Sequence, residues 1–161
     1  MAERIILDCD PGHDDAIALL LALASPEVEL LGVTTVAGNQ TLEKTTTNAI
    51  RILEFAGQTE ITVAAGADRP IVREPYVAKY VHGETGLDGP DLPQAQGSPL
   101  EEHAVDFLGR HADGITLVAV GPLTNVALML ARYPEARPAR IVLMGGSIGV
   151  GNVTPAAEFN I

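Results

Sequence analysis

Short apolar runs alternate along this chain with segments in which apolar residues recur at the spacing of a helix. Five runs are short and rich in apolar and β-branched residues, which predicts strands at 5–7, 28–36, 61–64, 115–120 and 141–144. Four segments have helical periodicity, which predicts helices at 14–24, 41–55, 99–111 and 122–132. Residues 69–98 are rich in proline and glycine and show little periodicity, so we expect a long loop of the kind that is functional or mobile in compact domains.

The predicted strands are apolar throughout rather than alternating, which is typical of strands buried on both faces. Helices between such strands imply a parallel sheet, and right-handed crossovers then give an open, doubly wound, mostly parallel α/β fold. The sequence contains no internal repeat or low-complexity tract. Its 161 residues are the length of one domain with a substantial core.

Ligands bind sheets of this type at the carboxyl ends of the strands, so the polar residues that follow each predicted strand are candidates for a site. They are Asp10, Asp14 and Asp15 after the first strand, Asn39 after the second, Thr124 and Asn125 after the strand at 115–120, and Asn152, Glu158 and Asn160 after the last. We expect these side chains to gather at one edge of the sheet.

Four carboxylates lie within eight residues at the first predicted strand-to-helix turn: Asp8, Asp10, Asp14 and Asp15. Two carboxylates about 5 Å apart at an effective dielectric constant of about 20 repel by roughly 3 kcal/mol. A helix N-terminus returns only about 0.3–1 kcal/mol per anion, so some groups must stay protonated or a cation must sit among them. The alternative is that Asp14 caps the helix while the other carboxylates are solvated.

An all-oxygen site at this turn suits Ca²⁺ or Mg²⁺. Zinc lacks a matching ligand set, because the four histidines are scattered along the sequence.

The net charge of −11 argues against binding to nucleic acid or to anionic lipid, both of which require a basic surface. The longest apolar run, residues 16–24, is too short to cross a bilayer, and the first residues lack the basic-then-apolar pattern of a signal peptide. The single cysteine, Cys9, excludes an internal disulfide and fits a reducing compartment. We therefore expect a cytoplasmic protein without a membrane or nucleic-acid partner.

The acidic turn reads Asp-Cys-Asp-Pro-Gly-His-Asp-Asp from Asp8 to Asp15, and it resembles the amino-terminal signature of the nucleoside hydrolases. Further matches follow in the family's order at residues 34–39 (TTVAGN), 82–83 (HG), 121–125 (GPLTN), 144–146 (MGG), 151–152 (GN) and 158–160 (EFN). The whole chain is therefore similar to the amino-terminal half of an inosine–uridine-preferring nucleoside hydrolase, with a Rossmann-like fold.

The resemblance implies a calcium-dependent enzyme of purine and pyrimidine salvage, a homotetramer that hydrolyses the N-glycosidic bond of ribonucleosides. Asp10 and Asp15 would bind Ca²⁺ with their carboxylates, and Thr124 would bind it with its backbone carbonyl. Asp10 would also accept a proton from the attacking water. The residues that hold the ribose would be Asp14, Asn39, Asn152, Glu158 and Asn160. Met144 would line the ribose pocket and His82 would lie near the base, which favours an enzyme that tolerates pyrimidines.

The residue types suit this chemistry independently. Calcium acidifies water less than zinc does, so a carboxylate must accept the proton. Cleavage passes through an oxocarbenium-like sugar, whose positive charge is stabilised by nearby anions. Three of the residues also have ordinary structural interpretations: Asn39 as a left-handed turn residue, Met144 as a core side chain, and His82 as a solvated loop residue.

Two other functions compete with this prediction. Asp8 and Asp10 are spaced like the nucleophile and acid of haloacid-dehalogenase-like phosphatases, but Gly12 and the pair Asp14 and Asp15 depart from that pattern. The second is a shortened, non-catalytic calcium- or ribose-binding module.

Full members of the resembled family are considerably longer, and their second half supplies a His-Asp pair with no counterpart in this chain. Residues 16–24 are apolar on every face, which suggests a helix covered on both sides. We therefore expect residues 1–161 to be the amino-terminal part of a single nucleoside hydrolase domain, to lack its C-terminal half and to be inactive alone.

Overall fold

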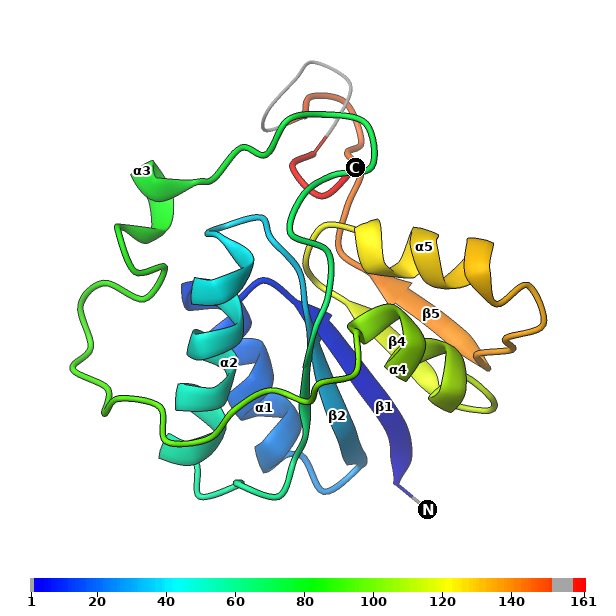
Figure 1. The fold of residues 1–161 in the computed structure, drawn as a ribbon, viewed down its shortest axis with the longest axis horizontal. Helices are drawn as coiled ribbons and strands as arrows, with labels where there is room; N and C mark the ends of the chain where they lie inside the picture. Colours follow the sequence, from blue (N-terminus) through cyan, green and yellow to red (C-terminus); the bar gives the residue numbers. More distant parts are fainter. Residues whose placement is uncertain (1, 152–157) are drawn as a thin grey trace.

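The computed structural model of the protein describes residues 2–151 and 158–161. Within them, five strands form one sheet in the order β3-β2-β1-β4-β5, and every neighbouring pair is parallel. The strands are β1 (Glu3–Cys9), β2 (Val28–Thr35), β3 (Val63–Ala65), β4 (Thr116–Ala119) and β5 (Arg140–Leu143). The helices are α1 (His13–Ala24), α2 (Leu42–Phe55), α3 (Lys79–His82), α4 (Ala104–His111) and α5 (Thr124–Arg132). The predicted α/β class with an open parallel sheet is confirmed (Figure 1).

Helices cover the sheet on both faces, as apolar strands require (Figure 1). Side chains alternate along β1, so Ile6 packs in a core with α4 and α5, while Leu7 and Cys9 pack with α1 and α2 on the other face. Asp8 follows the alternation and lies on the α5 side, where Asn125 bonds it. The doubly wound arrangement is therefore present.

The strand order reverses at β1, because β2 and β3 extend the sheet in one direction while β4 and β5 extend it in the other. The loops after β1 and β4 leave this switch point toward opposite faces and open a crevice at the carboxyl ends of the strands. In the register, Asp8 of β1 lies beside Thr34 of β2 and Ala119 of β4, so these three strands end at one level. The loops that carry the predicted site residues therefore start from the same edge.

The helix predicted at 99–111 starts five residues too early, since α4 begins at Ala104. Leu100 is extended instead: it forms a parallel bridge with Ala64, and its N–H donates to the carbonyl of Val63 at 2.8 Å. His103 then caps α4, its Nδ1 accepting from the N–H of Val105 at 3.2 Å. Pairing with the edge of β3 satisfies the backbone better here than another turn of helix would.

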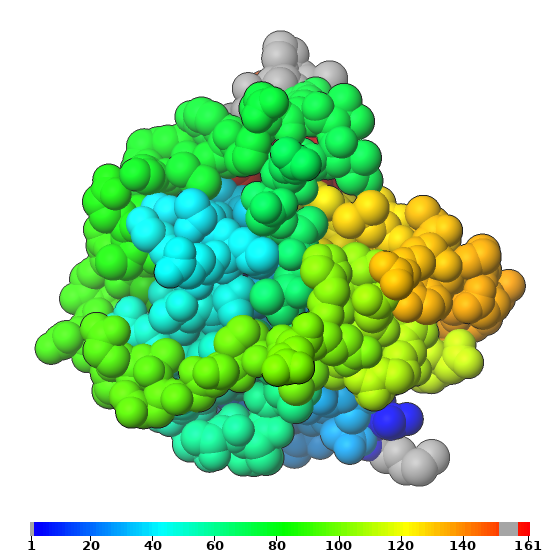
Figure 2. Space-filling view, in the orientation of Figure 1, coloured from blue at the N-terminus to red at the C-terminus, as the bar shows by residue number. Residues whose placement is uncertain are grey.

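The predicted loop at 69–98 contains the short helix α3, which the sequence did not reveal. The segment runs across α2, as the green band over the cyan helix in Figure 2 shows. Polar side chains from the α2 region hold it by donating to backbone carbonyls: Gln40 to Gly83 at 2.8 Å, Asn48 to Thr85 at 2.9 Å, and Arg51 to Pro93 at 2.7 Å. These contacts place α3 above the carboxyl edge of the sheet.

The bounds of two other elements also differ from those predicted. Strand β3 covers Val63–Ala65 rather than 61–64, and α5 begins at Thr124, so Pro122 precedes the helix instead of lying in its first turn.

On the apolar helix α1, Leu19 is fully buried, whereas Ile17 and Leu21 are 66% and 65% exposed. Among the described residues, no helix is long and apolar enough to cross a membrane.

Candidate functional site

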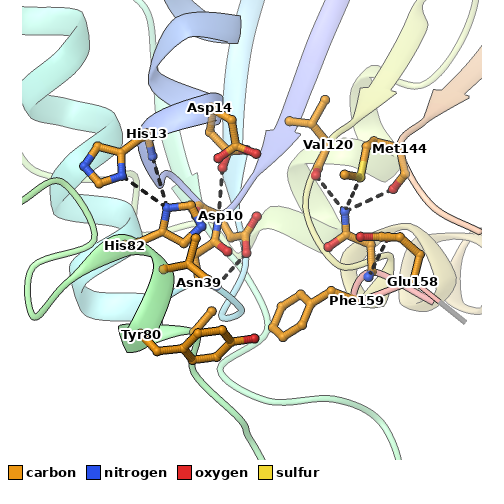
Figure 3. A pocket seen from close by; sticks show the side chains of 14 residues that line it. Asp10, His13, Asp14, Asn39, Tyr80, His82, Val120, Met144, Glu158 and Phe159 are labelled. Carbon is orange, nitrogen blue, oxygen red and sulfur yellow. Dashed lines mark hydrogen bonds between the residues drawn. The ribbon is translucent and has the colours of Figure 1, made fainter. Parts of the chain in front are cut away.

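A cavity of about 570 Å³ opens at the carboxyl edge of the sheet, over the switch point (Figure 3). It is lined by Asp10, His13, Asp14, Asp15, Asn39, Ala78, Tyr80, Val81, His82, Val120, Met144, Glu158, Phe159 and Asn160. Eight of the residues predicted from the sequence therefore meet around one space. Thr124 does not line the cavity, and Asn152 lies outside the described residues.

Three of the four clustered carboxylates are buried: Asp8 is fully inaccessible, and Asp10 and Asp15 are 2% and 3% exposed. Asp15 lies in the first turn of α1, where its Oδ2 accepts from the N–H of Gly12 at 3.2 Å. Asp14 is exposed at the cavity. The interpretation in which Asp14 caps the helix and the other carboxylates are solvated is therefore wrong, because Gly12 is the N-cap and the other three are buried.

Asn39 fixes two of the buried carboxylates. Its N–H donates to Asp10 Oδ2 at 2.6 Å, and its Nδ2 donates to the Asp10 carbonyl at 3.1 Å and to Asp15 Oδ2 at 3.2 Å. No non-glycine residue of the described chain has a positive φ, so Asn39 is not a left-handed turn residue. Its neighbour Gly38 must stay small, since a Cβ there would lie 2.2 Å from Asp10 Oδ2.

Burial disfavours the charged form of all three carboxylates. Burial raises the pKa of Asp8 from 3.8 to about 6 and that of Asp15 to about 6. For Asp10, burial and then the neighbouring charge of Asp15 hold the pKa well above its usual value. No ion pair of the described residues involves these three groups, and Asp8 Oδ2 and Asp15 Oδ1 lack a hydrogen-bond partner there.

This arrangement fits a hard cation, which would neutralise the charge and occupy free oxygen atoms. The described residues contain no group of three His, Cys, Asp or Glu side chains arranged to hold a metal ion. A cation here would therefore need further oxygen ligands from carbonyl groups, water, substrate hydroxyls or protein outside these residues.

His13 and His82 lie together at one side of the cavity, with ring centroids 5.5 Å apart and the two Nδ1 atoms at 3.4 Å (Figure 3). These two histidines are far apart in the sequence, and they meet because α3 lies over the start of α1. His82 is buried, so it is not a solvated loop residue, and burial lowers its pKa. Gly12 makes room for it, since a Cβ at Gly12 would lie 2.5 Å from His82 Nδ1.

The opposite side of the cavity is built by the last described residues (Figure 3). Asn160 Nδ2 donates to the carbonyls of Val120 at 2.8 Å and Met144 at 3.0 Å, and the Asn160 N–H donates to Glu158 Oε2 at 3.0 Å. Met144 is 45% exposed and lines the cavity, so it is not a core side chain. These bonds attach residues 158–160 to the ends of β4 and β5.

A known protein family matches nearly the whole chain, including every segment that builds this cavity. The family model described as inosine-uridine preferring nucleoside hydrolase matches residues 5–161. The chain belongs to this family.

Curated relatives support membership of the nucleoside hydrolase family along the entire chain. The pyrimidine-specific ribonucleoside hydrolase RihA of Shewanella baltica (strain OS155 / ATCC BAA-1091) is 57% identical over 100% of this chain and 52% of the relative. The protein of the same name from Escherichia coli O9:H4 is 54% identical over 100% of this chain and 54% of its own. The chain thus spans about half the length of these relatives.

Solved structures of nucleoside hydrolases share the fold. The purine-preferring ribonucleoside hydrolase from Gardnerella vaginalis has a TM-score of 0.93 at 34% identity, over 98% of this chain and 54% of its own. The plant nucleoside hydrolase PpNRh1 has a TM-score of 0.91 at 37% identity, over 99% of this chain and 53% of its own.

Several residues that line this cavity were not predicted from the sequence. Tyr80, Val81 and Phe159 line the cavity. The tyrosine and valine lie in the segment without periodicity, where no pattern distinguishes them. Asn125, one of the candidates expected after the strand at 115–120, does not line the cavity but donates to Asp8.

Proposed function

We propose that this chain forms the metal- and ribose-binding half of a calcium-dependent nucleoside hydrolase. The enzyme uses water to cleave the N-glycosidic bond of a ribonucleoside and releases the free base and ribose. One observation carries the proposal: of three buried carboxylates without a cationic partner among the described residues, two, Asp10 and Asp15, line a cavity with polar and aromatic walls. Family membership supplies the reaction class.

Asp10 and Asp15 are the proposed side-chain ligands of Ca²⁺, and the Thr124 carbonyl is the proposed backbone ligand. Support for the two carboxylates comes from their raised pKa values and from the free Oδ1 of Asp15. Thr124 is the first residue of α5, and the loop before it packs on Asp10: a Cβ at Gly121 would lie 2.8 Å from Asp10 Oδ1. Bound calcium would orient water and ribose hydroxyls and neutralise the carboxylates.

Asp10 is the proposed catalytic base. Its carboxylate accepts one proton from the attacking water while the oxygen adds to C1′ of the ribose and the bond to the base nitrogen breaks. The base nitrogen keeps the electron pair of that bond and takes up a proton from water, which gives the free base. The hydrogen bond from the Asn39 N–H holds Asp10 Oδ2 and leaves Oδ1 to accept that proton. Positive charge that develops on the sugar is stabilised by the surrounding carboxylates.

The proposed ribose contacts are Asp14, Asn39, Asn152, Glu158 and Asn160, with Met144 against the sugar. The proposed ribose contacts within the described residues lie on two sides of Asp10, which suits a ligand with hydroxyls on adjacent carbons. Amide and carboxylate partners distinguish a hydroxyl-bearing sugar from an apolar ligand, because an unmatched buried polar group costs binding energy.

The base is proposed to lie against the apolar side of the cavity, beside Tyr80, Val81 and Phe159, with His82 near its edge. A flat ring gains about 0.5–1.5 kcal/mol from an aromatic contact beyond the area that it buries. We propose pyrimidine ribonucleosides as preferred substrates, because the relatives at 54–57% identity are named pyrimidine-specific, whereas the purine-preferring structure is 34% identical.

We further propose that residues 1–161 belong to a single domain and that the protein is a cytoplasmic homotetramer. The buried thiol of Cys9 is consistent with a reducing compartment. The half-exposed Val142 and Leu143 of β5, together with Ile17 and Leu21 of α1, offer apolar surface for further protein to cover.

The test is to incubate the complete gene product with uridine in calcium, with and without phosphate, and to identify the sugar released. We expect free ribose at a rate independent of phosphate. Ribose 1-phosphate formed only with phosphate would show a phosphorylase instead. Calcium and uridine binding without turnover would favour the non-catalytic module.

A further inference from the structure

Asn125 is a fully buried amide in the first turn of α5, and it joins three segments of the carboxyl edge. Its Nδ2 donates to Asp8 Oδ1 at 2.8 Å and to the Thr35 carbonyl at 2.9 Å, and its Oδ1 accepts from the N–H of Ala67 at 2.9 Å. Both amide hydrogens and the carbonyl oxygen are therefore used. The side chain connects the ends of β1 and β2 and the loop after β3 to the start of α5.

The surroundings leave this amide no alternative position. A Cβ at Gly66 would lie 2.2 Å from Asn125 Oδ1, so the backbone after β3 lies directly against it. On its other side, Asp8 accepts from both Asn125 and the Thr34 hydroxyl at the same oxygen, Oδ1. Close contact on two sides fixes both the rotamer and the donor direction.

The acidic turn and the loop before α5 form one unit around this amide. The Asp8 carbonyl accepts from the N–H of Val120 at 2.9 Å, and Gly121 packs so closely on the Asp10 carboxylate that a Cβ there would lie 2.8 Å from Oδ1. Asp8 and Asp10 lie on the same side of the chain because they are two residues apart at the end of a strand. A displacement of α5 at Asn125 would therefore change the separation between Asp10 and the loop at 120–124.

We propose that Asn125 is a positioning residue that sets the calcium affinity of the site without touching the ion. It holds Asp10 and the start of α5, which carries Thr124, at the separation that the cation requires. The inference rests on the proposed function, because calcium at Asp10 and the Thr124 carbonyl is part of that proposal. Residues that orient metal ligands in this way change metal affinity by about 10–100-fold when they are removed.

The test compares two substitutions on the same helix in the complete gene product. Asn125→Ala removes all three hydrogen bonds, whereas Met129→Ala opens a hole in the apolar core under α5, where Met129 is fully buried, and leaves Asn125 in place. Calcium dissociation constants are measured by calorimetry, and melting temperatures of the metal-free proteins are measured alongside. We expect Asn125→Ala to weaken calcium binding by at least about tenfold. Met129→Ala should lower the melting temperature but leave the dissociation constant close to that of the wild type.

A calcium affinity of Asn125→Ala equal to that of the wild type would overturn the proposal, as would an equal loss of affinity in Met129→Ala. If Asn125→Ala does not fold, the comparison passes to Asn125→Asp, which sets a second carboxylate against Asp8, and to the same change combined with Asp8→Asn. In the double variant the amide at position 8 can donate to the carboxylate at position 125, which restores this bond but not the bond to the Thr35 carbonyl. Calcium affinity should therefore recover in part relative to Asn125→Asp alone, and no recovery would also overturn the proposal. A wild-type protein without calcium affinity contradicts the proposed function itself, and this inference with it.

Discussion

Asp8→Asn should make the metal-free protein more stable relative to the wild type as the pH rises. Asn has nearly the same shape as Asp, and its Oδ1 can still accept from Thr34 and Asn125. The amide nitrogen takes the place of Oδ2, which has no partner among the described residues, so the substitution carries a constant cost that does not depend on pH. The remaining difference between the two proteins is the titration of one buried carboxyl group.

The pKa of Asp8 gives the size and sign of this difference. Burial raises the pKa from 3.8 to about 6, so the folded protein keeps the proton between about pH 4 and 6 while the unfolded chain releases it. The stability due to neutral Asp8 is fully present below about pH 4 and is lost as the pH rises through about 6. A shift of this size corresponds to about 3 kcal/mol in the free energy of unfolding.

The assay is urea unfolding of both proteins in chelator at several pH values from 4 to 7. We expect the free energy of unfolding of Asp8→Asn, minus that of the wild type, to rise by about 3 kcal/mol across this range. The exposed loop residue Asp91 provides the control, because Asp91→Asn makes the same exchange of side chains away from the buried carboxylates. A difference for Asp8→Asn that rises no more than that of Asp91→Asn would refute the claim that burial holds this carboxyl group in its neutral form.

Three further predictions concern packing, substrate binding and the chain alone. Gly38→Ala should weaken calcium binding measured by calorimetry, because the new Cβ would meet Asp10 Oδ2 at 2.2 Å; Gly97→Ala, away from the cavity, should not. Tyr80→Ala should raise the KM for uridine by up to about tenfold with a smaller change in kcat, because it removes about 0.5–1.5 kcal/mol of ring contact. An unchanged KM in steady-state assays would count against Tyr80 as a base contact. Residues 1–161 expressed alone should show no uridine cleavage and should self-associate in sedimentation experiments, and an active monomer would contradict the proposed role of protein beyond this chain.

The fold was predictable because parallel strands carry a strong pattern. Buried on both faces, β1 and β4 show continuous apolar runs in the sequence, and the acidic turn follows β1 directly. Strand order and the switch point then bring together residues as distant in the chain as Asp10 and Asn160. A short sequence motif thus located most of the cavity.

Contacts between residues far apart in the chain could not be predicted from local sequence patterns. The start of α4 was misplaced because Leu100 pairs with Ala64 rather than extending the helix. The pairing of His13 with His82 depends on side chains of the α2 region that donate to backbone carbonyls of the segment at 83–93. Such hydrogen bonds produce no periodic pattern in the sequence of either segment. The same applies to Asn125, whose three partners come from three separate segments.

Calcium titration of the complete wild-type protein and of Asp10→Ala, by calorimetry at neutral pH, tests the central claim most directly. We predict one calcium ion bound per chain in the wild type, the same binding in Asp91→Asn, and the loss of most affinity and nearly all uridine turnover in Asp10→Ala. Calcium binding that is unchanged in Asp10→Ala would contradict the assignment of the acidic turn as the metal site.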